Sequence, residues 1–186
     1  MLNYTHTETH ERSLTKKMCL WDFKWHHYAP IFSIGDDSLH VTTDPHTDLW
    51  QRTYYRFRND NAPMFLVETD GRFFSFSVKT DFTQSGHRFD QCGIVMYLDA
   101  ENWLKASVEY ENEKFQHLGS VVTNHGYSDW ATTEIDADVK TMWYRLSRRE
   151  DDFLVECSPD EPFAGSPMRT IVNRPSRSDA ADWGSK

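Results

Sequence analysis

Apolar and polar residues alternate along much of this chain with a period of two, as expected for strands that have one buried face. In "RFFSFSVKT", for example, Phe74, Phe76 and Val78 share one face of an extended segment. Segments with this pattern recur about every 10 residues. They predict strands over residues 38–43, 49–58, 63–68, 72–80, 91–99, 102–110, 116–123, 141–149 and 152–158.

Turn-forming sequences separate the predicted strands, among them "RNDNAP", "DAEN" and "REDD". Many short strands at this spacing are typical of an antiparallel sandwich or barrel. No segment after residue 17 has a helical stripe of three turns. The pattern therefore predicts an all-β domain over residues 18–173, preceded by a disordered leader (1–17) and followed by a disordered tail (174–186).

One predicted strand, within "NWLKASVEYENE", has two different faces. Its small apolar residues alternate with a row made of Trp103, Lys105, Ser107 and Glu109. The short sequences "DAEN" and "ENEK" connect this strand to the predicted strands before and after it, so we expect it to have a neighbour on both sides. The row is then a solvated sheet face, a ligand platform or part of a catalytic site.

Composition and charge limit the function classes. The chain has 186 residues, enough for one domain with a single core, and its formal net charge of -9 argues against a nucleic-acid-binding surface. Its apolar runs are too short for a membrane span, and the polar leader lacks the apolar middle of a secretory signal. Three cysteines without zinc-ligand spacing fit a reduced intracellular protein, so we expect a cytoplasmic location.

Aromatic and polar side chains mix in three stretches, "TDLWQRTYYRF", "RFDQCGIVMYLD" and "GYSDWAT". Sugars stack on aromatic rings, while carboxylates, amides and cations fix their hydroxyl groups, so these residue types favour a carbohydrate site. The candidate ligand-binding residues are Asp48, Trp50, Arg52, Gln91, Trp103, Lys105, Glu109 and Trp130. The alternative is that the tryptophans only fill the core and that Arg52 and Glu109 form a structural ion pair.

Glu109, Glu111 and Glu113 form an E-x-E-x-E run. Retaining glycosidases need two carboxyl groups about 5–5.5 Å apart, and same-face residues of one strand permit that separation. The residues around Glu113 have turn character, however, and a solvated turn is the better interpretation. A glycoside hydrolase or lyase that uses Glu109 with Asp90 or Asp48 stays as an alternative. The histidines lack metal-ligand spacing and the glycines form no phosphate loop, so we expect neither a metal nor a cofactor.

These stretches resemble the domain of unknown function typified by the yeast "regulation of enolase" protein, in the concanavalin A-like lectin/glucanase superfamily. The motifs that carry the resemblance comprise Thr47, Asp48, Trp50 and Thr53; Asp90, Gln91 and Gly93; Asp99, Asn102, Trp103, Leu104 and Lys105; and Glu109, Ser128, Asp129 and Trp130. The resemblance implies a jelly-roll sandwich of two antiparallel sheets but no particular reaction. It also implies a final apolar strand, whereas here "MRTIV" is followed by the polar "NRPSRSDAADWGSK".

The sequence thus favours noncatalytic binding of a carbohydrate or sugar-like ligand on the concave face of a sandwich. Trp50 and Trp103 are expected to stack on the ligand, and the polar candidates are expected to bind its hydroxyl groups. The first alternative, which the family's name suggests, is a regulatory protein that contacts a metabolic enzyme such as enolase. The glycoside hydrolase ranks only second among the alternatives. The superfamily's glucanases carry glutamates around an aspartate on one strand, and this pattern is missing here.

Overall fold

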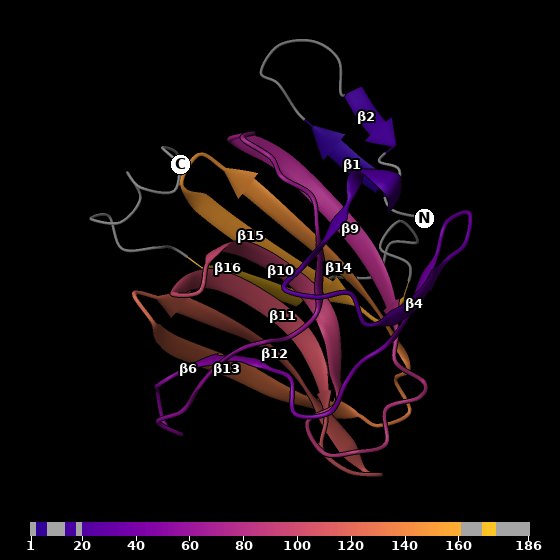
Figure 1. The fold of residues 1–186 in the computed structure, drawn as a ribbon, viewed down its shortest axis with the longest axis vertical. Coiled ribbons are helices and arrows are strands. Elements are labelled where there is room, and N and C mark those ends of the chain that lie inside the picture. The colour runs from indigo at the N-terminus through magenta and orange to yellow at the C-terminus, as the bar shows by residue number, and fades with distance from the viewer. Residues whose placement is uncertain (1–2, 7–13, 18–19, 161–168, 174–186) are drawn as a thin grey trace.

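The computed structural model describes residues 3–6, 14–17, 20–160 and 169–173. One sheet contains β1 (Asn3–His6), β2 (Leu14–Lys17), β9 (Phe73–Asp81), β14 (Thr141–Arg149), β15 (Asp152–Ser158) and β16 (Arg169–Asn173). The other contains β10 (Gln91–Asp99), β11 (Asn102–Tyr110), β12 (Phe115–Asn124) and β13 (Tyr127–Asp136). Their strand orders are β16-β15-β14-β9-β1-β2 and β10-β11-β12-β13 (Figure 1), and the strands pair antiparallel throughout.

Shorter elements connect and cover these sheets. They are a single 3-10 turn, η1 (Leu20–Asp22), and three two-stranded ribbons that pair β3 (Lys24–His26) with β8 (Met64–Leu66), β4 (Ile31–Ile34) with β5 (Leu39–Thr42), and β6 (Leu49–Gln51) with β7 (Arg58–Asp60). No helix in the described part of the chain is long and apolar enough to cross a membrane. The predicted all-β sandwich of two antiparallel sheets is therefore confirmed.

The main core lies between the two sheets. The strands of the larger sheet contribute residues such as Phe74, Tyr144 and Val155, and those of the smaller sheet contribute Leu104 and Val108. Because successive side chains of a strand point to opposite faces, these contacts fix which face of β11 is internal. The row of Trp103, Lys105, Ser107 and Glu109 therefore lies on the outer face, turned away from the larger sheet.

A second apolar layer covers one end of this outer face. Leu49 and Trp50 of β6 and Met64 of β8 pack there against Trp103 and Val121. Figure 1 shows the segment that carries β6 running across the four-stranded sheet. One end of the outer face is thus a buried interface, and the other end stays outside this layer.

Several predictions about local structure differ from the fold. The predicted strand 49–58 is two strands, β6 and β7, separated by a turn. β3, β4, β13 and β16 were not predicted, and β1 and β2 form in the leader expected to be disordered, where β1 pairs with β9. Residues 174–186, which hold the tail and the segment expected to lack a final strand, lie outside the described residues.

Candidate functional site

The outer face of the four-stranded sheet has a regular grid of side chains, because the four strands pair without interruption across it. One cross-strand row contains Gln91, Glu109, His117 and Glu134. The next row contains Gly93, Ser107, Gly119 and Thr132. We call these two rows the polar face. The two following rows, which hold Lys105 and Trp103, lead under the apolar layer.

Four polar side chains meet at one edge of the polar face. The Lys105 ammonium donates to Asp48 Oδ1 at 3.1 Å and to Gln91 Oε1 at 3.1 Å. Gln91 Nε2 donates to Asp48 Oδ1 at 3.3 Å, and the Ser107 hydroxyl donates to Gln91 Oε1 at 3.2 Å. Asp48 is held in turn by Asn61, whose side-chain oxygen accepts the Asp48 backbone N–H at 2.9 Å. The predicted convergence of Asp48, Gln91 and Lys105 is therefore present, and these groups have fixed orientations.

Glu109 lies beside this network without joining it. Its carboxylate forms no hydrogen bond or ion pair with any part of the chain that the structure describes, although it is only partly exposed. Burial raises the pKa of Glu109, and the Asp48 carboxylate adds to this rise. Lys105 and His117 oppose it, because positive charge favours the ionised carboxyl. Glu109 therefore has unused hydrogen-bonding capacity at a site where water is partly excluded.

His117 is the direct cross-strand neighbour of Glu109 on β12. Its Nδ1 is buried and has no hydrogen-bond partner. Its ring makes edge contacts with Phe115 and Trp130, whose centroids lie 5.4 and 6.1 Å away. Buried polar atoms are rarely left without a partner, so His117 Nδ1 marks a point on the sheet, beside Glu109, where a hydrogen-bond partner is missing.

Trp130 forms one wall of this region. Its side chain lies over Gly119, where a Cβ would come within 3.0 Å of the indole Nε1 and within 2.9 Å of the Ala131 carbonyl oxygen. Glycine is required here because any larger residue would push the indole away. The ring packs edge-on against both His117 and Trp50, yet 37% of the residue stays exposed. Trp130 thus offers an accessible aromatic surface next to the polar groups.

The other two candidate tryptophans are in a different environment. Trp103 has 0% exposure and Trp50 has 7%, because both are part of the apolar layer that β6 and β8 form on the sheet. Trp50 donates its indole N–H to the Thr53 carbonyl at 2.8 Å, whereas Trp103 Nε1 is buried without a partner. Their rings pack in this layer and are not available for stacking on a ligand in this conformation.

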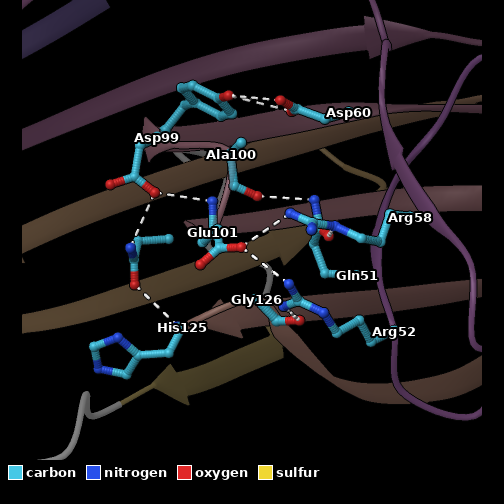
Figure 2. A network of polar contacts seen from close by, with 11 residues as sticks. Gln51, Arg52, Arg58, Asp60, Asp99, Ala100, Glu101, His125 and Gly126 are labelled. Carbon is cyan, nitrogen blue, oxygen red and sulfur yellow. Dashed lines mark hydrogen bonds and ion pairs between the residues drawn. The ribbon is translucent and has the colours of Figure 1, made fainter.

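Arg52 belongs to a separate polar network at the far end of the sheet (Figure 2). It donates from Nη1 to the Gly126 carbonyl at 2.6 Å and from Nη2 to Glu101 at 3.1 Å. Arg58 donates to the same Glu101 oxygen at 2.9 Å. The Arg52–Glu109 ion pair of the alternative interpretation is therefore absent from the described part of the chain, and Arg52 instead holds the neighbouring loops together.

The glycosidase alternative needs a second carboxyl group near Glu109. Asp90 accepts hydrogen bonds from the Gly86 and His87 backbone N–H groups and so fixes a loop, while Asp48 is bound to Lys105. Glu111 pairs with Arg88, and Glu113 is exposed in the turn, as predicted. In the described residues, no cluster of three histidine, cysteine or acidic side chains is arranged to hold a metal ion. Both carboxyl groups proposed to act with Glu109, those of Asp90 and Asp48, are thus engaged by other partners.

A groove of about 1610 Å³ lies beside the polar face, between β10, β9 and the ribbons of β3–β8 and β4–β5. Its lining is largely apolar and includes Phe23, Phe65, Phe76 and Met96. Gln91 contributes to both the groove and the polar face. The groove also holds polar groups, since Thr83 donates to Asp81 at 2.6 Å. The polar face combines an accessible indole with an unpartnered buried imidazole nitrogen, so we place the candidate site there.

Comparisons with known proteins agree with this architecture. The family model described as "Protein of unknown function (DUF1349)" matches residues 25–177. "Regulation of enolase protein 1" from Saccharomyces cerevisiae is 33% identical over 121 residues, which are 65% of this chain and 59% of that protein, so the match spans less than two thirds of the relative's length. A crystal structure of a functionally unknown protein from Saccharomyces cerevisiae is similar with a TM-score of 0.71 and 25% identity, over 85% of this chain and 82% of the other.

Proposed function

The chain belongs to the family of proteins of unknown function DUF1349, and from this premise we propose that it binds a small hydroxyl-rich ligand of the carbohydrate class on its polar face. The role is noncatalytic. The observation that carries the proposal is the buried, unpartnered Nδ1 of His117, which lies beside the Glu109 carboxylate and the partly exposed ring of Trp130.

The chemistry of the site supports a neutral, polyhydroxylated ligand. A carboxylate and an imidazole nitrogen accept hydrogen bonds from hydroxyl groups, and the Gln91 amide and the Ser107 hydroxyl add further polar contacts. The partly exposed indole of Trp130 presents an apolar surface to the C–H groups of a sugar ring. Lys105 is already paired with Asp48, so its ammonium is not free to favour an anionic ligand.

The roles of the candidate residues differ accordingly. Glu109, His117 and Trp130 contact the ligand directly in this proposal. Asp48 and Lys105 hold Gln91 in place, because each makes a hydrogen bond to it. The stacking role first assigned to Trp50 and Trp103 passes to Trp130, the more exposed ring at the same end of the site.

Thermal unfolding of the purified chain against a panel of mono- and oligosaccharides tests the proposal. A ligand present at about 100 times its Kd adds about 2.7 kcal/mol to the free energy of unfolding, which is about 5–10 °C in Tm for a domain of this size. We expect one saccharide class to raise Tm in the parent and to lose this effect in Glu109→Gln and Trp130→Ala.

Matched control variants separate the site from general surface effects. Glu113→Gln removes an exposed carboxylate from the neighbouring turn, and Trp143→Ala removes an indole from the outer face of the six-stranded sheet. Both controls are expected to keep the full ligand-induced shift. A shift that survives in Glu109→Gln and Trp130→Ala, or no shift with any saccharide, contradicts the proposal.

A second candidate function comes from the printed name of the relative, "Regulation of enolase protein 1". In this reading the chain regulates a metabolic enzyme such as enolase by contacting it directly. Titration of purified enolase with the chain, followed by enolase activity and by light scattering, tests it. A stable complex or a saturable change in activity supports the candidate, and neither at micromolar concentrations counts against it.

A further inference from the structure

We propose that the turn between β6 and β7, together with Tyr127, forms a preorganised docking surface for an acidic segment of a partner protein. The surface consists of Tyr54, Tyr55, Phe57 and Tyr127, and we call it the aromatic patch. The inference gives a contact surface to the second candidate function, on which it rests. It does not depend on ligand binding at the polar face.

The backbone of this turn is strained. Arg52, Tyr54 and Arg56 have φ values of 57°, 63° and 60°, in the left-handed region that side-chain-bearing residues seldom adopt. The Thr53 N–H donates to the Gln51 carbonyl and the Tyr55 N–H donates to the Thr53 carbonyl, both at 2.7 Å. Each bond closes a three-residue turn around a positive-φ residue, an arrangement that is rare and strained. Strain of this kind persists only where the surroundings enforce it, and it is concentrated at functional sites.

The surroundings enforce it through several independent contacts. The Trp50 indole N–H donates to the Thr53 carbonyl at 2.8 Å, and the Arg52 N–H donates to the Phe57 carbonyl at 2.8 Å. Glu101 receives hydrogen bonds from the arginines on both sides of the turn, and Arg58 also donates to Gln51 (Figure 2). The turn is therefore held by the Trp50 side chain and, at both ends, by the arginine contacts to Glu101.

The side chains that this turn displays are large and exposed. Tyr54 is 85% exposed, Tyr127 is 63% exposed, and Tyr55 and Phe57 are each more than 40% exposed. Three of the rings pack together, because the Tyr55 centroid lies 4.7 Å from that of Tyr54 and 5.5 Å from that of Phe57. Tyr127 is linked to the turn through Arg52, whose guanidinium lies 5.3 Å from the centroid of its ring. Exposed tyrosine and arginine side chains on a rigid scaffold have the composition of energetically dominant interface residues. A fixed display also lowers the entropy cost of binding.

The charge of the patch indicates the partner. Three arginines, Arg52, Arg56 and Arg58, surround it, and Glu101 neutralises only one positive charge. The exposed Arg56 side chain has no ion pair or hydrogen bond among the described residues. This local excess of positive charge stands on a chain whose formal net charge is -9. A segment that combines carboxylates with an aromatic or aliphatic side chain is complementary to both features of the patch.

Selection of a random peptide display library on the immobilised parent chain tests the inference. We expect the selected peptides to be acidic and to contain apolar side chains. Their affinity is expected to fall at least about tenfold in Tyr55→Ala and in Arg56→Glu, and to fall as salt is raised, because exposed charge pairs are screened. Ile31→Ser, which alters another strongly exposed apolar residue on β4, is the matched control and is expected to bind normally. Circular dichroism of each variant checks that the fold is intact.

Every other outcome overturns the inference. Neutral or basic peptides, peptides whose affinity is unchanged in both patch variants, or no selected peptide at all contradict it. Self-association of the chain that is lost in Arg56→Glu, or saccharide binding lost in Tyr55→Ala, assigns the patch to a different occupant. Glu109→Gln separates the two proposals, because it is expected to abolish the saccharide-induced Tm shift and to leave the peptide affinity unchanged.

Discussion

Replacement of Trp103 gives a quantitative test of how the outer face is divided into a buried and an open half. Trp103 is fully buried against Leu49, Trp50, Met64 and Val121, so truncation to alanine leaves a large cavity. Tryptophan-to-alanine changes in such positions cost about 3–5 kcal/mol. For a domain of this size, each kcal/mol corresponds to about 2–4 °C in Tm, so Trp103→Ala is expected to lower Tm by about 6–20 °C.

Trp103→Phe separates packing from hydrogen bonding at the same position. It keeps most of the ring but removes the indole N–H, which is buried without a partner. A buried donor without an acceptor costs about 1–3 kcal/mol, so its removal offsets much of the lost packing. Trp103→Phe is therefore expected to lose less than about 1.5 kcal/mol, within the usual cost of a shape-conserving core change.

Equilibrium urea unfolding, followed by circular dichroism and tryptophan fluorescence, measures both variants. Limited proteolysis adds a local readout, because the alanine variant is expected to expose the segment 48–66 to cleavage before the main core unfolds. An alanine variant within about 1 kcal/mol of the parent would place Trp103 outside a packed layer. A phenylalanine variant as unstable as the alanine variant would contradict the account of the unpaired indole N–H.

Three further predictions concern charge and packing. Burial, and to a smaller extent the neighbouring His27, lower the pKa of His26, so the His26 imidazole binds a proton more weakly in the folded state than in the unfolded state. Tm is therefore expected to fall as the pH drops below about 6.5. This fall is expected to be less steep in His26→Gln. The pKa of Glu109 is raised in the folded state, mainly by burial, so the ionised carboxylate destabilises the folded state at pH values above this pKa. Glu109→Gln is therefore expected to raise Tm at neutral pH. This increase in Tm is expected to disappear in acid, where Glu109 is protonated. Gly119→Ala places a Cβ against the Trp130 indole and is expected to cost about 1–3 kcal/mol in urea unfolding and to change Trp130 fluorescence.

The regular strands follow from alternation, and the irregular ones do not. β9, β10, β11, β12, β14 and β15 carry one apolar face each, and their predicted bounds agree closely with the structure. β13 has no such face, because it is an edge strand rich in threonine and acidic residues and is held by backbone hydrogen bonds to β12. The predicted strand 49–58 breaks at Arg52, where the backbone turns to positive φ without a glycine to mark the position.

The candidate site also has features that the sequence predicted and features that it did not. Asp48, Gln91 and Lys105 were named together because their residue types suit a sugar site, and they do converge. His117 was not among the candidates, although the short turn between β11 and β12 sets the register that places it opposite Glu109. The burial of Trp50 and Trp103 depends on how an irregular segment folds over the sheet, and no periodic pattern records that.

The proposed saccharide site is best tested by nuclear magnetic resonance titration with the saccharide panel, because the Gln91 side-chain amide, the Gly119 backbone amide and the Trp130 indole N–H are probes on or beside the polar face. We expect saturable shifts confined to these three signals and their neighbours on β10, β11, β12 and β13, with the Trp103 indole N–H unchanged. Shifts that map to the six-stranded sheet, or no saturable shift with any saccharide, would contradict the proposed site.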